Sequence, residues 1–142
     1  MSLTTDDPLA AAREILAAQA FNTVVGAELT DFGDGRAELV LDIADHHRQQ
    51  YGVVHGGVLA FLADNVVTFA AGSVLGTGVI TAGVDVSYLR AARAGSLRAV
   101  GSVARHTARH AVCTAEIWLE ATDSDPELCA IAQGTIFATS RT

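Results

Sequence analysis

One aspartate lies in the middle of the most apolar stretch of the sequence, where a carboxylate is energetically unfavourable. Asp64 lies within residues 58–75, which predict a helix that is apolar on nearly all sides. No basic residue occurs between Arg48 and Arg90, so the sequence offers this carboxylate no local ion pair. Because burying an unpaired carboxylate is unfavourable, we expect Asp64 to be buried for a chemical purpose, such as general-base catalysis.

A threonine and two glycines could complete a site around this aspartate. Thr68 follows Asp64 by four residues, so its hydroxyl shares a helix face with the carboxylate and could position it or a water molecule. Directly before the helix lie His55, Gly56 and Gly57, where the first N–H groups have no helical partner and the helix dipole is positive. A carbonyl group can approach these N–H groups closely because glycine has no Cβ, and they could then stabilise an oxyanion. Two adjacent glycines could equally form only a tight turn.

The elements that must position these residues follow from the hydrophobic periodicity. The acidic residue and proline at Asp7-Pro8 mark a helix start, and the apolar spacing predicts a helix to about Gln19. Strand patterns follow around a predicted hairpin turn at Gly33-Asp34-Gly35. The predicted strands cover residues 22–31, 36–43, 79–90, 96–107, 110–122 and 128–139.

This order of elements predicts an α+β fold in a single domain. One helix, two strands, a buried helix and four strands favour a long antiparallel sheet wrapped around one central helix. The N-terminal helix is expected within residues 1–20 and the central helix over 56–75, in a domain that spans residues 1–142.

Composition excludes several classes of function. The 142 residues are 50% hydrophobic, and the formal net charge of −7 argues against nucleic acid as a partner. Asp64 and Asn65 interrupt the long apolar run, which argues against a membrane span. The N-terminus has no signal-peptide pattern, so we expect a cytoplasmic protein.

Cysteines and histidines indicate neither a disulfide framework nor a metal site. Cys113 and Cys129 lie in predicted strands without metal-ligand spacing, and His46-His47 is expected to lie in a solvated loop. No metal and no other cofactor is therefore predicted.

The spacing from residue 49 to residue 64 resembles a known signature. Gln49, Gly52 and the run His55-Gly56-Gly57, followed by Asp64 nine residues after the histidine, are similar to the motif of hotdog-fold thioesterases. The resemblance covers roughly residues 20–140 and is to the PaaI-like group, which includes phenylacetyl-CoA and 4-hydroxybenzoyl-CoA thioesterases. It implies a hotdog fold and hydrolysis of an acyl- or aryl-CoA thioester to the free acid and CoA.

The resemblance also implies roles for individual residues. Asp64 would activate water or attack the thioester directly, while the Gly56 N–H, with Gly57 beside it, would polarise the thioester carbonyl. Gln49 stands where many relatives have asparagine, and Thr68 stands where a subgroup that uses glutamate carries a hydroxyl. The sequence thus combines features of two subgroups, which leaves the acyl group open.

Binding residues and partners are implied in the same way. His55 would mainly orient the loop before the helix, and Arg93 and Arg109 resemble positions that contact the CoA phosphates. The resemblance implies a homodimer or a homotetramer, built as a dimer of dimers, whose sites combine residues of two subunits, with Gln49 facing Asp64 of the neighbouring chain. The alternatives are a non-catalytic acyl-CoA-binding hotdog domain and a hotdog hydratase or dehydratase, whose characteristic motifs are absent here.

Overall fold

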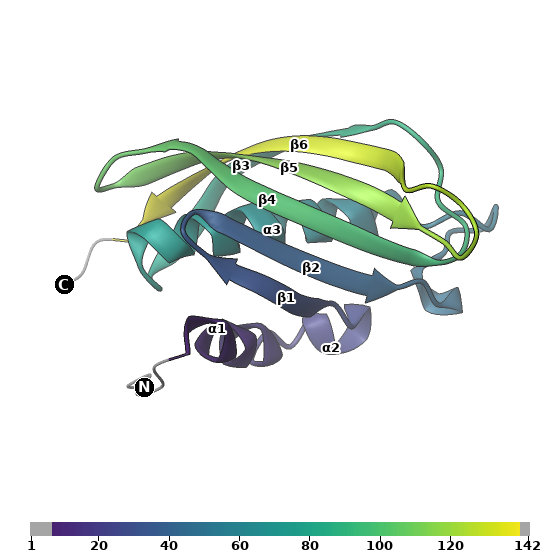
Figure 1. Ribbon diagram of the computed structural model, residues 1–142, viewed down its shortest axis with the longest axis horizontal. Coiled ribbons are helices and arrows are strands. Elements are labelled where there is room, and N and C mark those ends of the chain that lie inside the picture. Colours follow the sequence, from purple (N-terminus) through teal and green to yellow (C-terminus); the bar gives the residue numbers. More distant parts are fainter. Residues whose placement is uncertain (1–6, 140–142) are drawn as a thin grey trace.

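The computed structural model describes residues 7–139, and in this part of the chain six strands form one curved antiparallel sheet over a central helix (Figure 1). The strand order β1-β2-β4-β5-β6-β3 places β1 and β3 at the two edges. The predicted arrangement of a long antiparallel sheet around one helix is confirmed. The strands are β1 (Glu28–Gly33), β2 (Arg36–Asp42), β3 (Val79–Tyr88), β4 (Ser96–His106), β5 (His110–Glu120) and β6 (Glu127–Ala138).

The N-terminal segment forms two helices that lie along β1 (Figure 1). Helix α1 (Pro8–Ala17) begins as predicted, because Asp7 Oδ1 accepts a hydrogen bond from the Leu9 N–H at 3.1 Å. The first six residues of the predicted N-terminal helix region lie outside the described residues.

The prediction of a strand over residues 22–31 is wrong in its first half, where α2 (Asn22–Val25) forms instead. The Asn22 side chain hydrogen-bonds to both the N–H and the carbonyl of Ala27, at 3.0 Å each. Gly26 ends this short helix with φ +84°, a conformation that favours glycine. The strand therefore starts only at Glu28.

Helix α3 (Gly56–Leu75) has the bounds predicted for the central helix. Its length and hydropathy would suit a membrane span, but it packs against the sheet with Leu62, Val66 and Val67 fully buried. Two strand glycines lie directly beneath it. A Cβ on Gly101 would come within 2.7 Å of the Val66 carbonyl oxygen, and one on Gly134 within 3.0 Å of a Val67 methyl. The sheet can approach the helix this closely because neither position carries a side chain.

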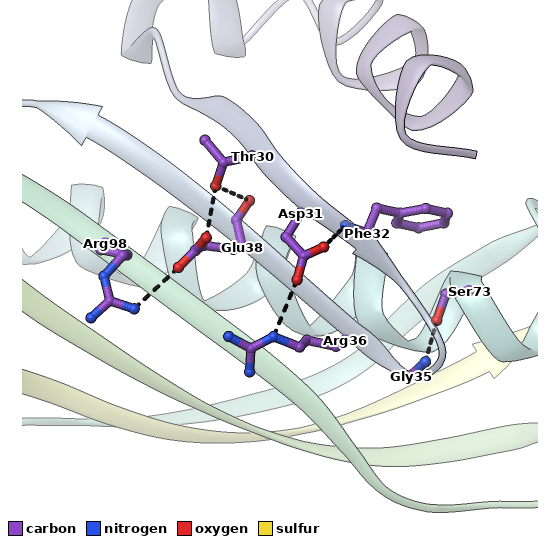
Figure 2. Close-up of polar contacts among 8 residues, drawn as sticks. All are labelled: Thr30, Asp31, Phe32, Gly35, Arg36, Glu38, Ser73 and Arg98. Carbon is purple, nitrogen blue, oxygen red and sulfur yellow. Dashed lines mark hydrogen bonds and ion pairs between the residues drawn. The ribbon is translucent and has the colours of Figure 1, made fainter. Parts of the chain in front are cut away.

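The predicted hairpin between β1 and β2 is confirmed and is tied to its neighbours on both sides. Figure 2 shows the Gly35 N–H donating to Ser73 Oγ of α3 at 2.8 Å, and Arg98 of β4 pairing with Glu38 of β2 at 3.1 Å. These contacts hold the hairpin to the C-terminal half of α3 and to the next strand.

Candidate active site

Asp64 lies on α3 beside two threonine hydroxyls. Thr81 Oγ1 of β3 donates to Asp64 Oδ1 at 2.7 Å, and Thr68 Oγ1 lies 3.3 Å from the same oxygen. The two hydroxyls are 2.8 Å apart. Within residues 7–139, Asp64 forms no ion pair, and its Oδ2 accepts no hydrogen bond. One carboxylate oxygen is thus held in place while the other remains available to a water molecule or a substrate.

The expected burial of Asp64 is wrong for the single chain, in which this residue is exposed. The reason is that the sheet covers only one side of α3. The opposite side carries the small residues Gly57 and Ala60 together with Asp64, and no other described element covers it. An apolar run in the sequence predicts that a helix is mostly buried. It does not show which face of the helix remains exposed to solvent.

Thr81 is a site residue that sequence reasoning missed. Val79 and Thr81 face α3, but the register of β3 shifts between Thr81 and Gly83, so that Val84 and Val86 face inward after the shift. A β-bulge of this kind reverses the inside–outside alternation along a strand. The alternation in the sequence alone therefore could not place Thr81 beside Asp64.

The N-terminus of α3 is capped by the histidine before it. His55 Nδ1 accepts a hydrogen bond from the Gly57 N–H at 2.8 Å, and a Cβ on Gly57 would come within 2.9 Å of that ring nitrogen. Gly57 must therefore lack a side chain for the cap to form. The Gly56 N–H makes no hydrogen bond within the described part of the chain, so it is free to bind a carbonyl oxygen.

The loop before α3 is fixed by a buried histidine. His47 Nδ1 accepts from the Ala44 N–H at 2.9 Å, so Nε2 carries the proton and donates to the Val25 carbonyl at 2.7 Å. The His47 carbonyl then accepts from the His55 N–H at 2.8 Å. The prediction that His46-His47 is solvated is wrong for His47, which anchors the loop that presents His55.

Gln49 and Gly56 line the same groove, which has a volume of about 390 Å³. The Gln49 side-chain oxygen accepts from the Tyr51 N–H. Tyr88, at the end of β3, lies over Gly56 and donates from its hydroxyl to the Gly56 carbonyl at 3.1 Å. We call this space the Gly56 groove. It is lined by the signature residues Gln49 and Gly56 and by Tyr88, which was not predicted as a site residue.

Asp64 and Gly56 do not meet within one chain. Eight residues of α3 separate them, which corresponds to about 12 Å along the helix axis at 1.5 Å per residue. A single thioester carbonyl cannot contact the Gly56 N–H and the Asp64 carboxylate of the same chain.

The two arginines expected to bind phosphates lie at opposite ends of the sheet. Arg93 precedes β4, where its guanidinium donates to the Tyr51 carbonyl at 3.3 Å, near the Gly56 groove. Arg109 lies in the turn after β4, whose eleven residues span roughly 35 Å at about 3.3 Å per residue. Of these two arginines, Arg93 is the one at the Gly56 end of β4, and Arg90, which was not predicted, lines the Gly56 groove itself.

Within residues 7–139, we looked for a cysteine nucleophile and for a set of metal ligands. Burial raises the pKa of the Cys113 thiol to about 11, and burial also raises the pKa of Cys129, so both remain inert thiols. No group of three or more His, Cys, Asp or Glu side chains in this range is placed to hold a metal ion.

Comparison with protein families gives a match to the model described as the thioesterase superfamily, over residues 51–124. This range begins just after Gln49 and contains Gly56, Asp64, Thr68 and Thr81. A 1,4-dihydroxy-2-naphthoyl-CoA hydrolase of Listeria monocytogenes is 25% identical over 115 residues, which cover 79% of this chain and 89% of that relative.

Solved structures share the fold over nearly the whole chain. A conserved protein of Pseudomonas aeruginosa is 34% identical, with a TM-score of 0.80 and coverage of 90% of this chain and 99% of that one. The PaaI protein from the E. coli phenylacetic acid degradation operon is 20% identical, with a TM-score of 0.79 and 92% coverage of both chains. The predicted hotdog fold is thereby confirmed.

Proposed function

Since the chain belongs to the thioesterase superfamily, we propose that it is an acyl-CoA thioesterase with Asp64 as its catalytic carboxylate. The observation that carries the proposal is the Asp64 carboxylate, which accepts a hydrogen bond from Thr81 through one oxygen while the other oxygen is free; the Thr68 hydroxyl, which donates to the Asp64 backbone carbonyl at 2.7 Å, lies 3.3 Å from the held oxygen. The similarity to a hydrolase named for an aryl-CoA substrate supports a CoA thioester as the substrate class.

The proposed reaction cleaves the bond between the acyl carbon and the CoA sulfur. Asp64 either takes a proton from the attacking water or attacks the acyl carbon itself, giving an anhydride that water then hydrolyses. In both routes the Gly56 N–H stabilises the negative charge that develops on the carbonyl oxygen. The products are the carboxylic acid and CoA, and water is the only co-reactant.

The proposed site is shared by two copies of the chain. Gly56 and Asp64 of one chain are too far apart to act on one carbonyl, whereas a two-fold axis near Ala60 would bring Gly56 of each copy close to Asp64 of the other. The stripe around Ala60 and Asp64 supports this, because it combines small residues with exposure. The neighbouring β3 is an edge strand with an unpaired side, which a second β3 could extend.

In this arrangement the Gly56 groove would hold the CoA end of the substrate. Gln49 would then face Asp64 of the other copy, and Arg93 at the rim of the groove would lie near the phosphates. Arg109 could join such a site only from the other copy, because it lies at the far end of β4. A homodimer is the smallest unit that would complete the site.

Mixing two inactive or weakened variants tests the shared site. We expect coexpressed Asp64→Asn and Gln49→Ala chains to give more activity than the two separate variants combined, because each mixed dimer regains one intact site. Random pairing makes about half of the dimers mixed, so activity should approach about a quarter of the wild-type value. Activity no higher than that of the separate variants would show that each site lies within one chain.

Thr81→Val should lower kcat by about tenfold with little change in KM, because the hydroxyl orients Asp64 and does not bind the substrate. Thr81→Ser keeps the hydroxyl and should restore most of the rate. Steady-state kinetics of the two variants provide the measurement. A rate lost equally in both variants would assign Thr81 a packing role.

The proposed activity is tested by measuring the release of free thiol from a panel of acetyl-, hexanoyl-, benzoyl-, phenylacetyl- and palmitoyl-CoA. We expect turnover of at least one member by the wild-type chain. Tight binding of an acyl-CoA without release of CoA would instead indicate a non-catalytic acyl-CoA-binding domain.

A further inference from the structure

Two adjacent histidines in the loop between β2 and α3 hydrogen-bond to the same short helix. His46 Nε2 donates to the Val24 carbonyl at 2.9 Å, and His47 Nε2 donates to the Val25 carbonyl at 2.7 Å. The centroids of the two rings are 4.1 Å apart. Both carbonyls belong to the last residues of α2, and the last carbonyls of a helix have no helical partner. The two side chains therefore join this loop to a segment 22 residues earlier in the sequence.

The two bonds differ in burial, and burial decides which of them holds the loop. His47 is 3% exposed and Val25 is buried as well, whereas His46 is exposed. Water can replace the bond that an exposed ring loses, but a buried carbonyl that loses its donor is strongly destabilising. The His47 bond therefore fixes the position of the loop against α2, and the His46 bond adds little.

The end of α2 is itself held in place, so it is a firm support for the loop. The Asn22 side chain bonds to the N–H and to the carbonyl of Ala27, at 3.0 Å each. The Gly26 N–H donates to the Asn22 carbonyl at 2.7 Å. The Val25 carbonyl lies within this closed turn, and His47 binds to it from the loop.

The backbone of His47 connects this support to the start of α3. Its carbonyl accepts from the His55 N–H at 2.8 Å, and Gly56 is the next residue. The same segment is held on its other side, where the Val54 N–H donates to the Ala92 carbonyl at 2.8 Å. The N–H that would bind the thioester oxygen is therefore one residue away from a hydrogen bond to His47.

We propose that His47 is a positioning residue of the thioester site, which sets the position of the Gly56 N–H through its bond to α2 and does not touch the substrate. This inference rests on the proposed thioesterase function and adds to it a residue that does not line the Gly56 groove. The ring serves this role only with its proton on Nε2, because Nδ1 accepts from the Ala44 N–H at 2.9 Å. Misplacing a group of an active site by about 1 Å can lower the rate by about 10²-fold.

Two substitutions separate the two bonds of the ring. The amide of His47→Gln reaches the place of Nε2 and can still donate to the Val25 carbonyl, whereas the amide of His47→Asn reaches only the place of Nδ1. We expect His47→Asn to lower kcat for the best substrate of the acyl-CoA panel by about 10–100-fold with little change in KM, because the bond to the oxyanion forms in the transition state. His47→Gln should restore most of the rate.

His46→Asn is the matched control. It removes the neighbouring bond to α2 from an exposed ring, so kcat should stay within about twofold of the wild-type value. A loss of rate in His46→Asn as large as that in His47→Asn, or equal rates in His47→Asn and His47→Gln, would overturn the positioning role and leave the thioesterase function intact.

NMR tests the positioning without a substrate. The ¹⁵N signals of the His47 ring in the wild-type chain should show a protonated Nε2 and an unprotonated Nδ1. In His47→Asn the His55 amide should exchange with solvent about tenfold faster or more, as expected when a buried hydrogen bond is lost. The Val66 amide, in the buried middle of α3, should keep its wild-type protection, which verifies that the variant is folded.

These readouts distinguish failure of the inference from failure of the proposed function. If the wild-type chain hydrolyses no acyl-CoA, the thioesterase function fails, and the exchange data alone decide the role of His47. Faster exchange at His55 in His47→Asn with wild-type exchange in His47→Gln would support it. Unchanged exchange at His55 in His47→Asn, or a wild-type His47 ring protonated on Nδ1, would overturn it.

Discussion

Asp64→Asn should lower kcat for acyl-CoA hydrolysis by about 10²–10⁴-fold, the range found when a positioned acid or base is removed. Asparagine has nearly the same shape, and its side-chain oxygen can still accept the hydrogen bond from Thr81, while Thr68 keeps its bond to the backbone carbonyl of residue 64, so the site geometry should survive. The side chain is exposed in the single chain, so the free energy of unfolding should change little. Steady-state kinetics and urea unfolding of the same preparation measure both effects.

A second aspartate provides the matched control. Asp123 lies exposed in the turn between β5 and β6, with φ +68°, a conformation that asparagine tolerates as well as aspartate. Asp123→Asn removes one negative charge in the same way and should leave both kcat and stability unchanged. Equal loss of rate in the two variants would point to net charge and away from a role of Asp64 in the reaction.

Gly101→Ala should produce the largest loss of stability, about 1–3 kcal/mol in the free energy of unfolding. Its Cβ would come within 2.7 Å of the Val66 carbonyl oxygen, so α3 and β4 must move apart. Because α3 carries Asp64, this shift should also lower the rate. Urea unfolding monitored by the fluorescence of Trp118 measures the loss.

Alanine substitutions of two other glycines provide a comparison for the loss of stability expected of Gly101→Ala. Gly134→Ala should cost less than Gly101→Ala, because its Cβ meets the Val67 methyl at 3.0 Å and a side chain can give way. Gly72→Ala should stabilise the chain by about 0.5–1 kcal/mol, because that Cβ meets nothing closer than 3.8 Å and alanine favours the helix. A Gly101→Ala variant as stable as wild type would show that the sheet does not depend on this close approach.

The regular parts of the fold could be predicted because their periodicity is long. The central helix and five of the six described strands follow hydrophobic patterns of seven residues or more, and their ends lie within a few residues of the prediction. Helix α2 could not be predicted, because four residues are too few for a period. It depends on the Asn22 side chain closing onto Ala27, a contact that no pattern reveals.

The site was predictable only in part, and for physical reasons. Thr68 follows from Asp64 by helical spacing, whereas Thr81 reaches Asp64 only because a bulge changes the inward face of β3. Arg93 and Arg109 are close in sequence, yet the length of β4 separates them. The spacing of residues in the sequence predicts which side chains lie together on one helix or strand. It does not predict which side chains of different helices and strands come together.

The exposure of Asp64 could not be predicted from the sequence either. The sequence around it correctly indicates a helix that packs in the core, but the sheet covers only one side of that helix. The side left open carries the catalytic candidate. The shared site proposed above would cover it with a second copy of the chain.

The most direct test of the central claim compares CoA release by wild type and Asp64→Asn from the best substrate of the acyl-CoA panel, at equal protein concentrations. We expect the wild-type rate to rise in proportion to protein concentration, with one equivalent of free acid for each CoA released, and the variant rate to be about 10²–10⁴-fold lower. Equal rates for the two proteins, or no release of CoA by the wild-type chain from any member of the panel, would contradict the assignment of Asp64 as the catalytic carboxylate of a thioesterase.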